Sequence, residues 1–177
     1  RANPGKLTCA SSGAGSAIHM SCELFKIQTN TNILHVPYKG TAQLVPAVTS
    51  GEIHLVIDGH TNYVPMVREG KLRAIAVTTS RPSAFFPDLP TLAETVPGST
   101  LPNSWYGLIG PRNLPQPVVQ RLYQSLLGAL KTQDVQAWLT KNQHDGGGNT
   151  PEEFAAEIRR SFDIYDRAIK LAGVKPE

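Results

Sequence analysis

A short run of serine and glycine residues contains the groups best suited to binding an anion. The run comprises Ser11, Ser12, Gly13, Ala14, Gly15 and Ser16, and a helical pattern begins directly after it. Glycine lets a ligand approach backbone N–H groups closely, and the first turn of a helix carries about half a positive charge. We therefore expect residues 11–16 to bind a carboxylate. The alternative, an ordinary strand-to-helix turn in which Ser16 caps the helix, stays open.

Four further residues are candidates for the same site, namely His19, Tyr38, Lys39 and Asp58. Asp58 follows a buried strand pattern, where a carboxylate can bind a hydroxyl, an amine or a water, although such an acid also forms turns. Lys39 would supply a cation and Tyr38 a surface for the ligand's carbon chain, but contact with water and core packing are the commoner roles of these residue types. His19 either lines the cleft or packs inside the protein.

The sequence lacks the patterns of nucleotide-binding and serine-hydrolase sites. Gly13 and Gly15 could begin a dinucleotide fingerprint, but Ile18 occupies the third glycine position, and no acid for a ribose follows at the required distance. Ser16 and His19 do not form a nucleophile elbow, which needs the pattern Gly-x-Ser-x-Gly. We expect no catalytic residue and no cofactor, and we predict that the protein is not an enzyme.

A metal site is also disfavoured by the sequence. The histidines and the acid that come closest to a ligand set are His54, Asp58 and His60. His54 lies in the middle of an expected strand and the other two at its end, so their side chains do not converge on one point. We expect no metal.

Composition excludes several classes of protein. The chain has 177 residues, of which 40% are hydrophobic and 18% charged, and it carries a net charge of +3. No apolar run approaches the ~20 residues that span a bilayer, and the basic residues are scattered, so we expect neither a membrane span nor a nucleic-acid partner.

Residues 1–5 resemble the end of a helix running into a turn, so we expect the sequence to begin inside a larger protein. Cys9 and Cys22 form a disulfide or remain two buried thiols, and both alternatives stay open.

The order of apolar patterns predicts an α/β lobe. Expected strands cover residues 6–10, 33–36, 53–57 and 72–78, and expected helices cover residues 16–28, 41–50 and 62–69. This alternation is typical of a doubly wound, mainly parallel sheet, in which the loops after the strands meet at one edge. Ligands of open α/β sheets bind at that edge. Residues 11–16, Tyr38, Lys39 and Asp58 all lie in such loops.

The remainder of the chain indicates part of a second lobe. Prolines punctuate a connecting segment after Ser80, residues 105–110 are an expected strand, and helices are expected at 115–132, 134–141 and 151–172. These helices have apolar faces but only one strand of their own to cover. We therefore predict a ligand-binding lobe at 1–103 and, at 104–177, the C-terminal part of a second lobe whose N-terminal half would precede Arg1.

Several motifs in order along the chain resemble one known family. They are Ala2-Asn3-Pro4-Gly5-Lys6, Ser11-Ser12-Gly13-Ala14-Gly15-Ser16, His35-Val36-Pro37-Tyr38-Lys39-Gly40, Gly70-Lys71-Leu72-Arg73-Ala74-Ile75-Ala76-Val77, Leu89-Pro90-Thr91, Trp105-Tyr106-Gly107 and Thr150-Pro151-Glu152-Glu153-Phe154. Together they resemble the Bug family, the substrate-binding receptors of tripartite tricarboxylate transporters. The resemblance covers essentially the whole chain, although Cys9 and Cys22 do not belong to the family pattern.

The resemblance implies a type II periplasmic binding protein, in which two lobes close over a small carboxylate and present it to a membrane permease. It implies that residues 11–16 form the carboxylate clamp of the second lobe and that Asp58 faces the cleft. We thus expect a periplasmic receptor for a di- or tricarboxylate, an amino acid or a similar organic acid. The alternative is a sensory or interaction module, such as the effector-binding lobe of a regulator.

Overall fold

The computed structural model describes residues 2–79, 82–83, 86–99, 101, 105–142, 144 and 146–174. The chain divides into two compact units. Unit 1 comprises residues 1–103 and 162–177, and unit 2 comprises residues 104–161.

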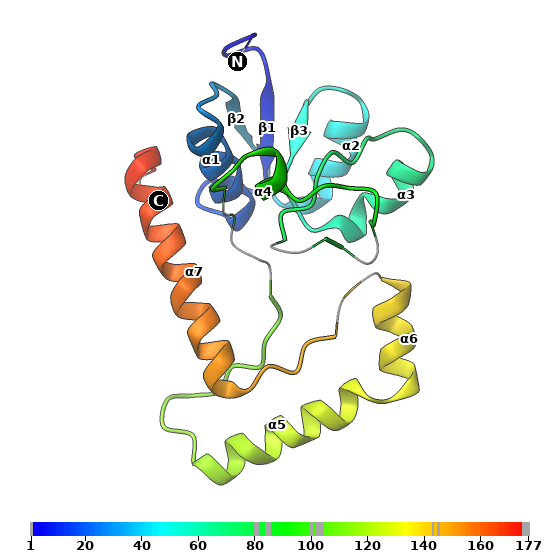
Figure 1. The fold of residues 1–177 in the computed structure, drawn as a ribbon, viewed down its shortest axis with the longest axis vertical. Coiled ribbons are helices and arrows are strands. Elements are labelled where there is room, and N and C mark those ends of the chain that lie inside the picture. Colours follow the sequence, from blue (N-terminus) through cyan, green and yellow to red (C-terminus); the bar gives the residue numbers. More distant parts are fainter. Residues whose placement is uncertain are drawn as a thin grey trace. The chain divides into compact units, whose positions relative to one another are not determined.

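Unit 1 is built on three parallel strands, β1 (Thr8–Ser11), β2 (Leu34–Pro37) and β3 (Leu55–Val56). Their order in the sheet is β2-β1-β3, so β1 is central (Figure 1). A central first strand with neighbours added on both sides is the doubly wound pattern predicted from the sequence. The carboxyl ends of the strands therefore bring the three following loops to one edge.

Helices and turns of unit 1 follow the strands in the predicted order. They are α1 (Ala17–Thr29), a 3-10 turn (Thr41–Gln43), α2 (Leu44–Thr49), a second 3-10 turn (His60–Asn62), α3 (Val64–Arg68) and α4 (Leu92–Thr95). The hydroxyl of Ser16 caps α1 by accepting the His19 N–H at 3.2 Å. Asn30, with a φ of 49°, ends the helix in the left-handed conformation that asparagine tolerates.

The sheet is smaller than the sequence predicts. Of the expected strand 53–57 only Leu55 and Val56 pair with β1, and residues 72–78 form no strand in the described part of the chain. Residues 72–78 make instead a single parallel bridge between Val77 and Thr91. Apolar β-branched residues predict an extended backbone, but a strand also needs a partner whose hydrogen-bonding edge is in reach.

The two faces of β1 are covered by different helices. Ala10 belongs to a core cluster with Leu44 and Ala47 of α2, whereas Cys9 lies in a cluster with Cys22 of α1. Successive strand residues point to opposite faces, so α2 covers the face of Ala10 and α1 the face of Cys9, with Ile18 at the start of α1 also reaching the Ala10 cluster.

Cys9 and Cys22 form a disulfide, with 13 residues of sequence separation. This resolves the alternatives that the sequence left open. The cross-link ties β1 to α1, and the closed segment contains the whole 11–16 loop.

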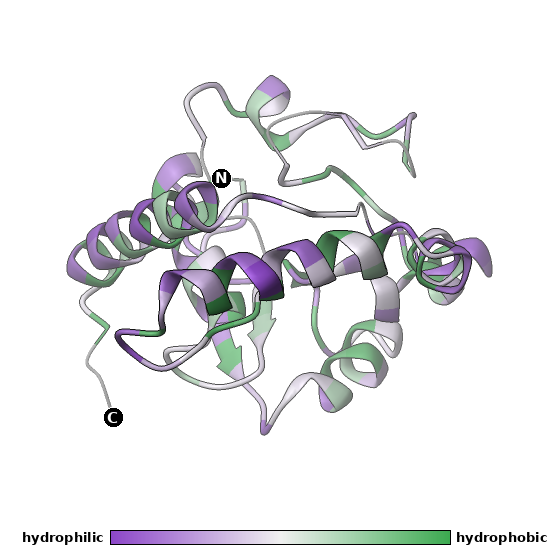
Figure 2. Cartoon of the chain, turned by 90° about the horizontal axis from the view of Figure 1, so that it is seen from below, coloured by the Kyte–Doolittle hydropathy of each residue, from purple (hydrophilic) through white to green (hydrophobic). Residues whose placement is uncertain are grey.

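Unit 2 contains α5 (Gln116–Leu130), α6 (Gln133–Lys141) and the first half of α7 (Pro151–Ala172). Thr150 and Glu153 form a capping box at the start of α7, with hydrogen bonds of 2.8 and 3.2 Å. Hydrophilic and hydrophobic residues share the surfaces of these helices (Figure 2). The expected strand 105–110 has no strand partner in the described residues and is exposed along its length.

The second half of α7 belongs to unit 1 and its first half to unit 2. Ala168 is fully buried in a cluster with Met20 and Leu24 of α1, whereas Phe162 and Leu171 remain 70% and 62% exposed. The domain ranges 1–103 and 104–177 stay a prediction. The assignment of the two units to the two lobes of a receptor stays a prediction. In the described residues, no helix is long and apolar enough to cross a membrane.

Candidate functional site

The loops after β1 and β2 lie against each other at the carboxyl edge of the sheet. The Tyr38 N–H donates a hydrogen bond to the Ser11 carbonyl at 2.8 Å. A Cβ added at Gly13 would lie 3.7 Å from the Tyr38 carbonyl oxygen. Residues 11–16 and Tyr38 thus form one continuous surface.

Four N–H groups at the 11–16 loop and the start of α1 are hydrogen-bonded within the protein. Gly13 N–H donates to Ser11 Oγ at 3.3 Å, Gly15 N–H to His19 Nδ1 at 3.0 Å, Ser16 N–H to the Gly13 carbonyl at 3.3 Å and His19 N–H to Ser16 Oγ at 3.2 Å. The Ser16 cap is the alternative that the sequence left open, whereas the pairing of the Gly13, Gly15 and Ser16 N–H groups was not anticipated.

Four other N–H groups in the same stretch have no partner among the described residues. They belong to Ser12, Ala14, Ala17 and Ile18. Ala17 and Ile18 open the helix, where the first N–H groups lack intrahelical acceptors. The stretch therefore presents a set of donors that a negatively charged group can use.

Glycine is required in this loop for its backbone conformation. Gly13 has a φ of 137° and Gly15 a φ of 75°, which are values that most other residues adopt only with strain. A Cβ at Gly15 would meet no heavy atom within 4 Å. A side chain at Gly15 would thus occupy open space beside the free N–H of Ala14.

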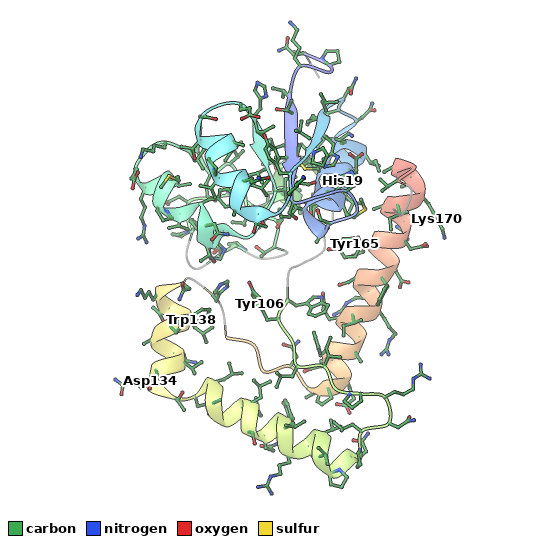
Figure 3. The ribbon with its side chains drawn as sticks, turned by 180° about the vertical axis from the view of Figure 1, so that it is seen from behind. His19, Tyr106, Asp134, Trp138, Tyr165 and Lys170 are labelled. Atoms are coloured by element: carbon green, nitrogen blue, oxygen red, sulfur yellow. A yellow bond between two sulfur atoms is a disulfide. The ribbon has the colours of Figure 1, made fainter. Side chains whose placement is uncertain are left out.

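His19 belongs to the first turn of α1 (Figure 3). Its ring stacks on that of His35 in β2. The two ring centroids are 3.7 Å apart and the rings are 12° from parallel. His19 Nδ1 accepts the Gly15 N–H, so its proton lies on Nε2, which is 3.6 Å from Glu23 Oε1.

His35 is a residue of this region that sequence reasoning did not select. Its Nε2 lies 2.6 Å from Ser11 Oγ. The Ser11 hydroxyl also lies 3.0 Å from the Gly13 carbonyl, and the tautomer of the His35 ring sets which atom donates in the contact with Nε2. The only signal in the sequence was the position of His35 near the end of an expected strand.

Burial keeps both histidines neutral. Loss of solvent lowers the pKa of His35 to about 4, and the adjacent His19 ring adds to this effect. Burial likewise lowers the pKa of His19, against the opposing influence of Glu23. Neutral rings are what the hydrogen bonds require, since a protonated His19 could not accept the Gly15 N–H.

The closest set of potential metal ligands in the described residues is His19, Glu23 and His35. Their arrangement does not suit an ion. Parallel rings direct their lone pairs along parallel lines rather than toward one point. Both Glu23 oxygens also bind Lys26 Nζ, at 2.7 and 2.8 Å, which neutralises the carboxylate.

Tyr38 and Lys39 lie beside the 11–16 loop, and they differ in how far their side chains are held by protein contacts. The Tyr38 hydroxyl donates to Glu52 Oε1 at 2.9 Å, and its ring packs against the core cluster of Ala10. Lys39 is exposed, and its ammonium group has no ion-pair partner in the described residues. Lys39 is thus a free cation at this edge, whereas Tyr38 is held by the protein.

Asp58 makes the contacts of a turn. Its Oδ1 accepts the Gly59 N–H at 2.7 Å and its Oδ2 accepts the Tyr63 hydroxyl at 2.9 Å. This hydrogen bonding matches the structural alternative weighed from the sequence. A ligand role for Asp58 stays a prediction.

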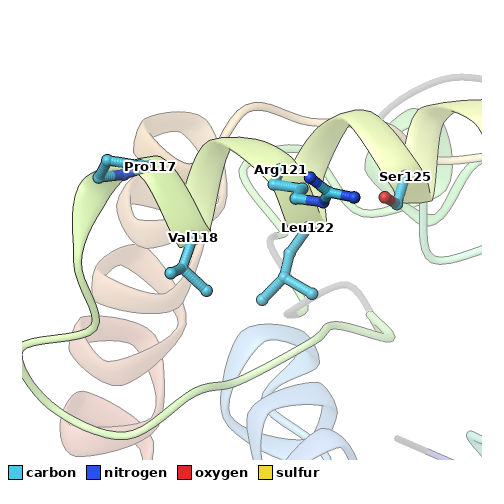
Figure 4. A pocket seen from close by; sticks show the side chains of 5 residues that line it. All are labelled: Pro117, Val118, Arg121, Leu122 and Ser125. Carbon is cyan, nitrogen blue, oxygen red and sulfur yellow. The ribbon is translucent and has the colours of Figure 1, made fainter.

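Two pockets lie on other parts of the described chain. One is a shallow depression on α5, lined by Pro117, Val118, Arg121, Leu122 and Ser125 (Figure 4). Another is lined by Arg73, Ala74, Ile75, Asp88, Leu89 and Pro90. The surface of residues 11–16 is an open edge within unit 1.

Comparison with known proteins gives one consistent family. A family described as "Tripartite tricarboxylate transporter family receptor" matches residues 1–161. A UPF0065 protein in the tcbD-tcbE intergenic region of Pseudomonas sp. strain P51 is 33% identical over 171 residues, covering 96% of this chain and 51% of the relative. A UPF0065 protein in the clcB-clcD intergenic region of Pseudomonas knackmussii is 30% identical over 161 residues, covering 89% of this chain and 94% of the relative. The chain therefore spans about half of the first relative and most of the second.

Solved structures agree with the family match. R. palustris Rpa4515 with adipate has a TM-score of 0.85 at 31% identity, covering 100% of this chain and 59% of that chain. The periplasmic binding protein BugD has a TM-score of 0.81 at 29% identity, covering 99% and 60%. MatC from Rhodopseudomonas palustris with bound malate has a TM-score of 0.72 at 30% identity, covering 91% and 57%. These likenesses confirm the predicted resemblance and the predicted α/β fold of a periplasmic binding protein.

Proposed function

The chain belongs to the tripartite tricarboxylate transporter receptor family, and from that premise we propose that it helps to capture a small carboxylate for such a transporter. In this proposal the protein works in the periplasm, delivers its ligand to membrane permease subunits and performs no chemistry. Its relatives and structural neighbours are binding proteins rather than enzymes.

The observation that carries the proposal is the set of unpaired N–H groups at Ser12, Ala14, Ala17 and Ile18. Donors at the start of a helix favour an anion over a neutral or cationic ligand. The exposed Lys39 adds a positive charge on the neighbouring loop.

Dicarboxylates are the ligand class that we favour. The neighbouring proteins Rpa4515 and MatC bind adipate and malate, and each of these ligands carries two carboxylates. In our proposal the 11–16 loop binds one carboxylate and leaves the rest of the ligand to other contacts. Ser11, His19 and Asp58 are then indirect contributors, because their polar groups are already hydrogen-bonded in the protein.

A pair of substitutions at Gly15 tests the proposal by charge alone. Asparagine and aspartate both tolerate the left-handed backbone of Gly15, and a Cβ there meets no nearby atom. Gly15→Asp places a negative charge beside the free N–H groups, whereas Gly15→Asn has nearly the same shape without the charge. Isothermal titration calorimetry of the full gene product with adipate, malate and a panel of other organic acids measures both.

We expect Gly15→Asn to retain binding and Gly15→Asp to lose at least about a hundredfold in affinity, since two like charges a few ångströms apart repel strongly even when partly solvated. Equal affinity in the two variants would remove the 11–16 loop from the site. Absence of heat and of thermal stabilisation with every acid would contradict the ligand class. Uptake restored to a gene-deleted strain by wild type but not by Gly15→Asp would support the transport role.

A further inference from the structure

Two chains of hydrogen bonds lead from the stacked histidines into the 11–16 loop. His19 Nδ1 accepts the Gly15 N–H at 3.0 Å. His35 Nε2 is hydrogen-bonded to Ser11 Oγ at 2.6 Å, and Ser11 Oγ in turn binds both the carbonyl and the N–H of Gly13, at 3.0 and 3.3 Å. Each glycine of the loop is thus fastened to one ring of the pair.

We propose that His19 and His35 are positioning residues that hold the 11–16 loop in the conformation that leaves the Ser12 and Ala14 N–H groups free for a ligand. The inference rests on the proposed function, because it takes this loop as the carboxylate site. The histidines do not touch the ligand in this scheme. They act through Gly13, Gly15 and Ser11.

The physical reason is the flexibility of glycine. Gly13 and Gly15 have φ values of 137° and 75°, and an unrestrained glycine samples many other conformations. A ligand that has to order such a loop loses affinity to the entropy of ordering. Hydrogen bonds that exist before the ligand arrives remove that cost. They also give the Gly13 and Gly15 N–H groups acceptors within the protein, so that the ligand meets the N–H groups of Ser12 and Ala14.

The arrangement requires a neutral His19. Protonation at Nδ1 would set an N–H donor against the Gly15 N–H donor and break the contact. The titratable and charged groups that face the ring are Glu23 and Lys26 on α1 and His35 on β2. Burial lowers the pKa of His19, so the contact persists at neutral pH and is lost on acidification.

Conservative substitutions distinguish a positioning role, exerted through hydrogen bonds, from a role of the side-chain volume in packing. In His19→Asn the side-chain oxygen can take the place of Nδ1 as acceptor, and in His35→Gln the side-chain amide, which carries both a donor and an acceptor, can take the place of Nε2 beside Ser11. His19→Leu and His35→Leu remove these groups while keeping apolar volume. His54→Asn, an exposed histidine of the same unit whose ring bonds Thr8, is the matched control.

Calorimetry with adipate and malate gives the first readout. We expect each leucine variant to lose about tenfold or more in affinity, which is the effect of one lost hydrogen bond, and the Asn and Gln variants to stay within about threefold of wild type. On acidification below pH 6.5, wild-type affinity is expected to fall more steeply than that of His19→Asn, because only wild type loses the Gly15 contact when His19 is protonated. Titration of the ligand itself is common to both proteins and cancels in the comparison. Leucine variants that bind as tightly as wild type would overturn the proposal.

A second readout needs no ligand. Ring ¹⁵N chemical shifts are expected to place the proton of His19 on Nε2, and the amides of Gly13 and Gly15 are expected to exchange with solvent faster in the leucine variants than in the Asn and Gln variants. A proton on Nδ1 of His19 in wild type would refute the positioning role, and this result does not depend on whether the leucine variants fold. Unchanged amide exchange in folded leucine variants would refute it as well. If wild type binds neither acid while these spectra are as expected, the dicarboxylate proposal fails and the positioning of the loop stands.

Discussion

Breaking the Cys9–Cys22 disulfide should destabilise unit 1 by about 3 kcal/mol. The cross-link closes a segment with 13 residues of separation, and the chain-entropy relation gives about 3 kcal/mol for a loop near that length. Both cysteines are 1% exposed. Reduction of wild type leaves the sulfurs in place and isolates the cross-link, whereas a Cys9→Ala/Cys22→Ala variant adds the cost of the vacated volume.

The assay is urea unfolding with and without a reductant, followed by native-state hydrogen exchange. With a slope of about 2 kcal/mol per molar urea, a loss of this size lowers the midpoint by about 1.5 M. Amides of α1 and β1 report unit 1, and amides of α5 in unit 2 are the internal control. We expect protection to fall in α1 and β1 and to change much less in α5.

Two outcomes would refute this reasoning. Two reactive thiols in the denatured, unreduced protein would show that Cys9 and Cys22 are not paired. An unchanged midpoint after verified reduction would show that the denatured chain is already as restricted as the cross-linked one.

Three further predictions follow from individual contacts. The folded pKa of His35 is about 4, below the ordinary 6.5, so the unfolded state binds more protons between these pH values. The free energy of unfolding therefore falls as pH is lowered from 6.5 toward 4. Urea unfolding at several pH values should show a weaker pH dependence in His35→Gln than in wild type. Tyr63→Phe removes the hydrogen bond to Asp58 and should cost about 1 kcal/mol in the same assay, with no change in ligand affinity if Asp58 serves only the turn. Ala168 is fully buried against Met20, so Ala168→Leu should cost about 1–3 kcal/mol and loosen the second half of α7, which limited proteolysis would detect; an intact helix would contradict that packing.

The local sequence pattern was sufficient to predict the elements of much of unit 1. The capping serine at position 16, the spacing of apolar residues and the asparagine after Thr29 define α1, and the helix lies within one residue of its expected bounds. The strands were less predictable because the same apolar run is compatible with longer or shorter pairing. Only the three-dimensional sheet decides that β3 pairs at Leu55 and Val56 alone.

The site shows the limit of reasoning from spacing. The residues of the 11–16 loop can be selected from composition, but which of their amides are free cannot. That depends on His35, which bonds to Ser11 across 24 residues of sequence, and on the side chain of His19 folding back onto Gly15. A histidine beside a glycine loop has the same local signature whether it binds a ligand or holds the backbone.

The hydrogen-bond free energy of the free N–H groups limits how tightly the 11–16 loop can bind a carboxylate without other contacts. Four charge-assisted hydrogen bonds, at about 1.5–3 kcal/mol each, give a gross stabilisation of about 6–12 kcal/mol. Association costs an estimated 4–15 kcal/mol, and micromolar binding needs about 8 kcal/mol net. With values near the middle of these ranges, the gross stabilisation from the N–H groups of Ser12, Ala14, Ala17 and Ile18 is offset by the cost of association, and little remains toward micromolar affinity. Tight capture requires contacts from outside this loop, and each kcal/mol saved by fixing Gly13 and Gly15 in advance counts directly toward affinity.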